Sequence, residues 1–101
     1  MKKDSYTTDV IFRVDNTKDF GGTVFAIFPH VVVTKSGLVS TYQHVGQHSG
    51  ADYKRCLETS KLATTKEAKE LKNELENHFG YNLKVMKRRN YDKYLESYHK
   101  R

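Results

Sequence analysis

The sequence has 101 residues, of which 37% are apolar and 30% are charged, and this length suits a single domain with one modest core. We expect residues 1–101 to form that domain, with frayed ends at 1–7 and 99–101. No apolar run approaches the roughly 20 residues that cross a bilayer, and the one cysteine, Cys56, cannot form an internal disulfide. These features predict a cytoplasmic protein without a membrane partner, and no motif calls for a cofactor.

The positive charge is concentrated near the C-terminus. The formal net charge is +6, and residues 81–101 supply five of these charges. A dense positive segment attracts polyanions, so its expected partner is nucleic acid or an acidic protein surface. A solvated basic tail without a partner is the alternative.

Apolar alternation predicts a sheet in the first half of the chain. Residues 9–14 alternate with a period of two, which is typical of a strand. Residues 23–28 predict a second strand that is apolar on both faces, either central in the sheet or exposing an apolar face to a partner. This strand either ends at Pro29 or continues over 30–34 after a bulge. Residues 39–47 predict a third strand with one face toward solvent.

The main helix is predicted at residues 65–79. Thr64 and Glu67 have the spacing of a capping box, in which each side chain bonds the other's backbone N–H. Behind this box, apolar residues recur at helical spacing: Ala68, Leu71, Leu75 and Phe79. Gly80 follows as the C-terminal cap, because glycine adopts the left-handed backbone that ends many helices.

These elements together predict an α+β fold. Short helices are expected near 51–60 and 91–99, and residues 81–87 predict a fourth strand with Tyr81, Leu83 and Val85 inward. Strands joined by short turns pair antiparallel. We therefore expect a two-layer sandwich, in which the main helix covers a mostly antiparallel sheet of about four strands.

A histidine-rich segment is the only candidate for chemistry. His44 and His48 share one face if the segment is a strand, and with Asp52 they resemble a two-histidine, one-carboxylate metal site. The same residues also suit acid–base catalysis, with Ser49 or Tyr53 as the activated hydroxyl. The structural alternative is that His44 bonds across the sheet while Asp52 or Ser49 caps the following helix.

The predicted binding residues combine cations with an aromatic ring, which suits phosphate contact and base stacking. They are Lys84, Lys87, Arg88, Arg89, Lys93 and Tyr91. The tyrosines of residues 91–99 lie at helical spacing, so they alternatively dock the last helix onto the domain.

Four segments together resemble a family of small uncharacterised proteins encoded by bacteriophages and bacterial mobile elements. They are V-I-F-R at 10–13, A-I-F-P at 26–29, H-V-G-Q-H-S-G-A-D-Y at 44–53 and G-Y-N-L-K-V-M-K-R at 80–88. The resemblance covers roughly residues 9–89 and implies a phage or bacterial origin. It implies no activity, so it supplies no catalytic residue.

We expect a small non-enzymatic binding protein that contacts nucleic acid or an acidic protein through its basic C-terminal segment. This expectation requires the cations to gather on one accessible surface. One alternative is a small enzyme or metal-binding protein that uses His44, His48 and Asp52. Another is a protein–protein interaction module or homodimer that uses the apolar second strand.

Overall fold

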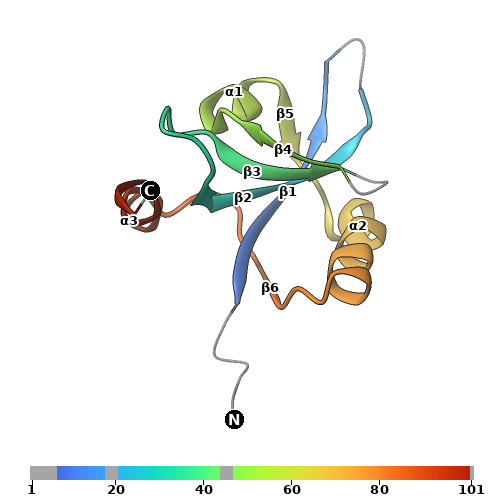
Figure 1. The fold of residues 1–101 in the computed structure, drawn as a ribbon. Helices are drawn as coiled ribbons and strands as arrows, with labels where there is room; N and C mark the ends of the chain where they lie inside the picture. Colours follow the sequence, from blue (N-terminus) through green and yellow to red (C-terminus); the bar gives the residue numbers. More distant parts are fainter. Residues whose placement is uncertain (1–6, 18–20, 44–46, 101) are drawn as a thin grey trace.

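The computed structural model describes residues 7–17, 21–43 and 47–100. Its strands are β1 (Thr8–Asp15), β2 (Val24–Val32), β3 (Val39–Gln43), β4 (Gln47–Ala51), β5 (Ser60–Leu62) and β6 (Leu83–Val85). Its helices are α1 (Tyr53–Glu58), α2 (Thr65–His78) and α3 (Tyr91–His99), as Figure 1 shows. Most of the ends predicted to fray lie outside the described residues, although His99 still belongs to α3.

The strands form one sheet in the order β4-β3-β2-β1-β5, and β6 also pairs with β1. All of these pairs are antiparallel except β1 with β6. β5 pairs with residues 13–15 of β1, and β6 pairs with residues 8–10. The two short strands therefore share one edge of β1, and neither pairs with Phe12 at its middle.

Helices cover both faces of the sheet. Val10 and Phe12 of β1 pack in one cluster with Leu75 of α2. The alternate residue Ile11 packs in a second cluster, against which Tyr94 of α3 lies. Figure 1 shows α2 and α3 on opposite sides of the sheet. The α+β class, the mainly antiparallel sheet and the main helix are confirmed, and the shorter helix α3 lies on the sheet face opposite α2.

The second strand explains why helices are needed on both faces of the sheet. Residues 25–28 of β2 are buried on both faces, so an apolar face left open for a partner is not present there. β2 continues through Pro29 to Val32, with an irregular register between Phe28 and Val32. This confirms the predicted continuation past a bulge.

α2 begins and ends close to where the sequence predicts. The Thr64 hydroxyl accepts a hydrogen bond from the Glu67 N–H (3.1 Å), and the Glu67 carboxylate accepts one from the Thr64 N–H (2.8 Å). The inward face buries Ala68, Leu71 and Leu75. Gly80 follows with φ of 74°, a left-handed backbone conformation that residues other than glycine adopt only with strain.

Within the described residues the sheet has six strands, where the sequence predicts about four. The third strand ends at Gln43, and residues 47–51 return beside it as the separate strand β4. The sequence does not predict β4, because its residues are small or polar. It does not predict β5, because three residues are too few to show an alternating apolar pattern.

β6 is shorter than the strand predicted over 81–87. Leu83 and Tyr81 pack against the α2 cluster as expected, whereas Val85 is 54% exposed and not inward. Val85 lies across a groove from the first turns of α2, so no helix covers it. Met86 packs against the cluster on the opposite face.

Candidate binding surface

The predicted histidine site has no described geometry. His44 lies outside the described residues, and for His48 only the backbone is described, in β4 opposite Tyr42. Asp52 is exposed and caps α1, because its carboxylate accepts a hydrogen bond from the Lys54 N–H (3.2 Å). Within residues 7–17, 21–43 and 47–100, no group of three His, Cys, Asp or Glu side chains is placed to hold a metal ion.

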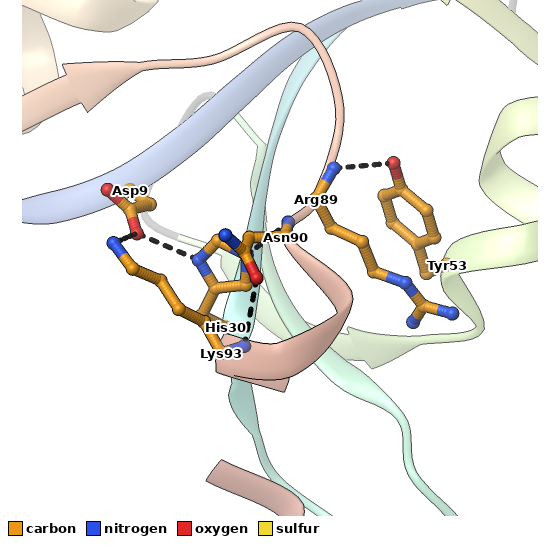
Figure 2. Close-up of polar contacts among 6 residues, drawn as sticks. All are labelled: Asp9, His30, Tyr53, Arg89, Asn90 and Lys93. Atoms are coloured by element: carbon orange, nitrogen blue, oxygen red, sulfur yellow. Dashed lines mark hydrogen bonds and ion pairs between the residues drawn. The ribbon is translucent and has the colours of Figure 1, made fainter. Parts of the chain in front are cut away.

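Arg89 is held between aromatic rings. Its guanidinium carbon lies 4.2 Å from the ring centre of Tyr94, 4.5 Å from that of Tyr53 and 5.4 Å from that of Tyr91. Its backbone N–H also donates to the Tyr53 hydroxyl (2.9 Å), as Figure 2 shows. Tyr53 belongs to α1 and Tyr94 to α3, so Arg89 joins two helices. These contacts give the Arg89 side chain a structural role within the fold.

Lys93 forms an ion pair within the fold, although its side chain is 52% exposed. Its Nζ lies 3.4 Å from Oδ2 of Asp9, which also lies 2.8 Å from Nδ1 of His30 (Figure 2). The Asn90 N–H donates to the other ring nitrogen of His30, Nε2, at 2.7 Å. A ring nitrogen that accepts carries no proton, so neutral His30 holds its proton on Nδ1 and donates it to Asp9.

The pKa of Asp9 reflects these neighbours. Burial raises this pKa, but the hydrogen bond from His30 and the charge of Lys93 lower it by more, so the pKa lies below its ordinary value. Asp9 is therefore an ionised carboxylate that offsets the charge of Lys93. The second predicted cation is thus also engaged within the fold.

The tyrosines of α3 dock this helix onto the domain. The Tyr94 hydroxyl donates to the Gly37 carbonyl (3.1 Å), and the Tyr98 hydroxyl donates to the Lys35 carbonyl (3.0 Å). The Tyr91 ring stacks on Tyr94 at 5.9 Å between centres, and it remains 57% exposed. These contacts favour the docking interpretation over base stacking for Tyr94 and Tyr98.

Three of the predicted cations remain open to a partner. Lys84 lies in β6, and Lys87 and Arg88 lie in the connection from β6 to α3; all three side chains are exposed. None of them forms an ion pair with a described residue. Among the predicted cations, Arg89 and Lys93 thus contact other side chains of the fold, whereas these three have no such ion pair with a described residue.

One residue near Lys87 was not predicted from the sequence. Leu62 at the end of β5 is 41% exposed and lines the same groove as Val85 and Lys87. No pattern marks it, because a three-residue strand carries no periodicity and the pairing of β5 with β1 is long-range.

No protein-family model, curated protein or solved structure matches this chain. The resemblance to the bacteriophage and mobile-element family therefore stays a prediction, as does the cytoplasmic location. In the part of the chain that the structure describes, the helices are too short or too polar to cross a membrane.

Proposed function

We propose that this protein is a non-enzymatic binding module for an acidic protein segment, which it contacts through Lys84, Lys87 and Arg88. The observation that carries the proposal is that these exposed cations follow closely in the chain without an ion pair to a described residue. Unpaired surface cations create a positive potential that attracts carboxylates and accelerates encounter.

The surroundings of these cations favour a protein over a nucleic acid. Val85 lies between Lys84 and Lys87 in the chain and is 54% exposed, and Leu62 is 41% exposed nearby. Aliphatic side chains gain most by packing against other apolar side chains, as they do at the centre of protein interfaces. Base stacking needs free aromatic faces, whereas the Tyr94 and Tyr98 rings stack on each other at 6.2 Å between centres, and of the three α3 tyrosines Tyr91 is the most exposed, at 57%.

A charge-matched pair of variants tests this function. The triple variant Lys84→Ala, Lys87→Ala, Arg88→Ala is compared with Lys35→Ala, Lys54→Ala, Arg55→Ala, which removes equal charge from exposed side chains elsewhere. Fluorescence anisotropy with labelled poly-L-glutamate at low salt measures the affinity. We expect the first variant to bind about tenfold more weakly and the control to bind nearly as the wild type, because each exposed ion pair contributes about 0.2–1 kcal/mol.

Two results contradict the proposal. Equal weakening by both triple variants would mean that only net charge matters, and no local surface would then exist. Tighter binding of a single-stranded oligonucleotide, lost in the first variant alone, would assign the same cations to nucleic acid. Raising the salt concentration must weaken the wild-type complex, because the contacts are exposed and screened.

A further inference from the structure

A groove of about 250 Å³ opens between the first turns of α2 and the edge of the sheet. Its apolar lining includes Phe12, Leu62, Ala63, Val85 and Met86. The groove lies where β5 and β6 share one edge of β1: the Ala63 N–H, directly after β5, donates to the Phe12 carbonyl (2.9 Å), and β6 pairs with residues 8–10. An apolar surface that no element covers is available to a side chain from outside.

The rim of this groove is positively charged. Lys72 and Lys87 both line it. Lys72 forms an ion pair with Glu76 (3.1 Å), whereas Lys87 has no ion pair with a described residue. Arg88 follows directly in the chain and is exposed. An apolar floor beside unpaired cations is complementary to an apolar side chain with carboxylates next to it.

The dimensions suit one large side chain. A cavity of about 150 Å³ is enough to bind benzene, so the groove has room for an aromatic ring or a branched aliphatic group. A second copy of this chain is a poorer occupant, because it would bring its own net charge of +6 to a basic rim.

We infer that the groove holds one large apolar side chain of the acidic segment, while the neighbouring carboxylates of that segment pair with Lys87 and Arg88. The inference rests on the proposed function, since it names the anchor of the same partner. It adds that apolar burial, in addition to charge, determines which acidic segments bind.

Two acidic peptides distinguish the contribution of the apolar side chain to affinity from the contribution of charge. One is a short run of Asp and Glu with a central Phe, and the other has Ser in place of this Phe. We expect the wild type to bind the Phe peptide at least about tenfold more tightly, because its ring leaves water on binding. Isothermal titration calorimetry or fluorescence anisotropy gives both affinities.

Matched variants locate the anchor site. The double variant Leu62→Ala, Val85→Ala truncates the two exposed aliphatic side chains of the apolar lining. It should lose most of the preference for the Phe peptide. Leu57→Ala with Val31→Ala is the control, because these side chains are 38% and 43% exposed and do not line the groove. It should keep the preference. Val85→Ala alone, at a side chain 54% exposed, provides a milder variant if the double variant unfolds.

The outcomes distinguish the two proposals. Equal affinity of the wild type for both peptides, with binding still lost in the charge variant, would overturn the groove and leave the proposed function standing. Failure of both peptides to bind would overturn the proposed function as well. Analytical ultracentrifugation could instead reveal a dimer that is lost in the variant Leu62→Ala, Val85→Ala. This result would show that a second copy of the chain occupies the groove and would contradict the inference.

Discussion

Asp9 joins three parts of the chain through a single carboxylate oxygen. Its Oδ2 lies 2.8 Å from His30 in β2 and 3.4 Å from Lys93 in α3. His30 in turn accepts a hydrogen bond from the backbone of Asn90, the N-cap of α3. The charge on Asp9 therefore stabilises the attachment of the last helix, which makes this attachment sensitive to acid.

We predict that Asp9 contributes to stability only while it is ionised. Its lowered pKa means that the folded state binds the proton less tightly than the unfolded state, so the contribution is present above the unfolded pKa of about 3.9 and is lost as the pH falls through the folded pKa. Asp9→Asn should reduce the free energy of unfolding by about 1–2 kcal/mol near pH 6, with a smaller difference from the wild type near pH 2. Urea unfolding at several pH values measures this difference.

Glu70→Gln is the control, because Glu70 is exposed in the middle of α2, far from Asp9 in the chain, and forms no ion pair with a described residue. A difference between Asp9→Asn and the wild type that stays constant down to the lowest pH would show that the ionised form of Asp9 has no special role.

At the scale of elements, α3 is attached mainly by hydrogen bonds and ring contacts. It buries no residue completely, yet Ser97 accepts a hydrogen bond from the Val32 N–H (3.1 Å) and Tyr94 reaches the turn at Gly37. Gly37 has φ of 93°, and a Cβ there would lie 2.5 Å from the Tyr94 hydroxyl. Only glycine allows this close approach, so the turn and the helix depend on each other.

Alanine substitutions at the adjacent residues Arg88 and Arg89 should differ in their effects on stability and binding. Arg89→Ala should lower the free energy of unfolding by about 1–2 kcal/mol, because it removes a guanidinium stacked between α1 and α3. Arg88→Ala should change stability by less than about 0.5 kcal/mol and should weaken binding to the acidic peptides. Urea unfolding and amide hydrogen exchange of α3 measure the first effect, and similar destabilisation by both substitutions would contradict it.

At the scale of the whole molecule, one sheet supports two cores. β1 supplies Val10 and Phe12 to the cluster under α2, and Ile11 to the cluster on the other face. β2 divides its residues in the same way, with Phe28 on one face and Ile27 on the other. Because the same strands form both cores, damage to one core should also weaken the other.

We therefore predict one cooperative unfolding transition, even when a single core is damaged. Leu75→Ala removes a fully buried side chain under α2 and should cost about 2–5 kcal/mol. Far-UV circular dichroism and the near-UV signal of the tyrosines, which lie on both faces, should still report the same midpoint in urea. A near-UV signal that is lost in two separate steps would show that the two cores unfold separately.

Local patterns predicted much of the fold. The capping box at Thr64 and Glu67 and the apolar repeat behind it place α2 correctly, since both signals lie within a few turns of chain. Alternation along β1 predicts its two faces for the same reason. β4 was not predicted because its residues are small or polar, and β5 was not predicted because its three residues become a strand only by pairing with the distant strand β1.

For the candidate site, the sequence by itself determined that the positive charge lies after the main helix, because charge is a property of composition. Only the tertiary structure decided which cations are available. Lys93 meets a carboxylate from β1, and Arg89 meets a ring from α1, at long distances along the chain. Lys84, Lys87 and Arg88 meet no such partner among the described residues, and Lys87 lines a groove formed where two short strands share one edge. Pair interactions depend on distance in space, and the order of residues does not reveal it.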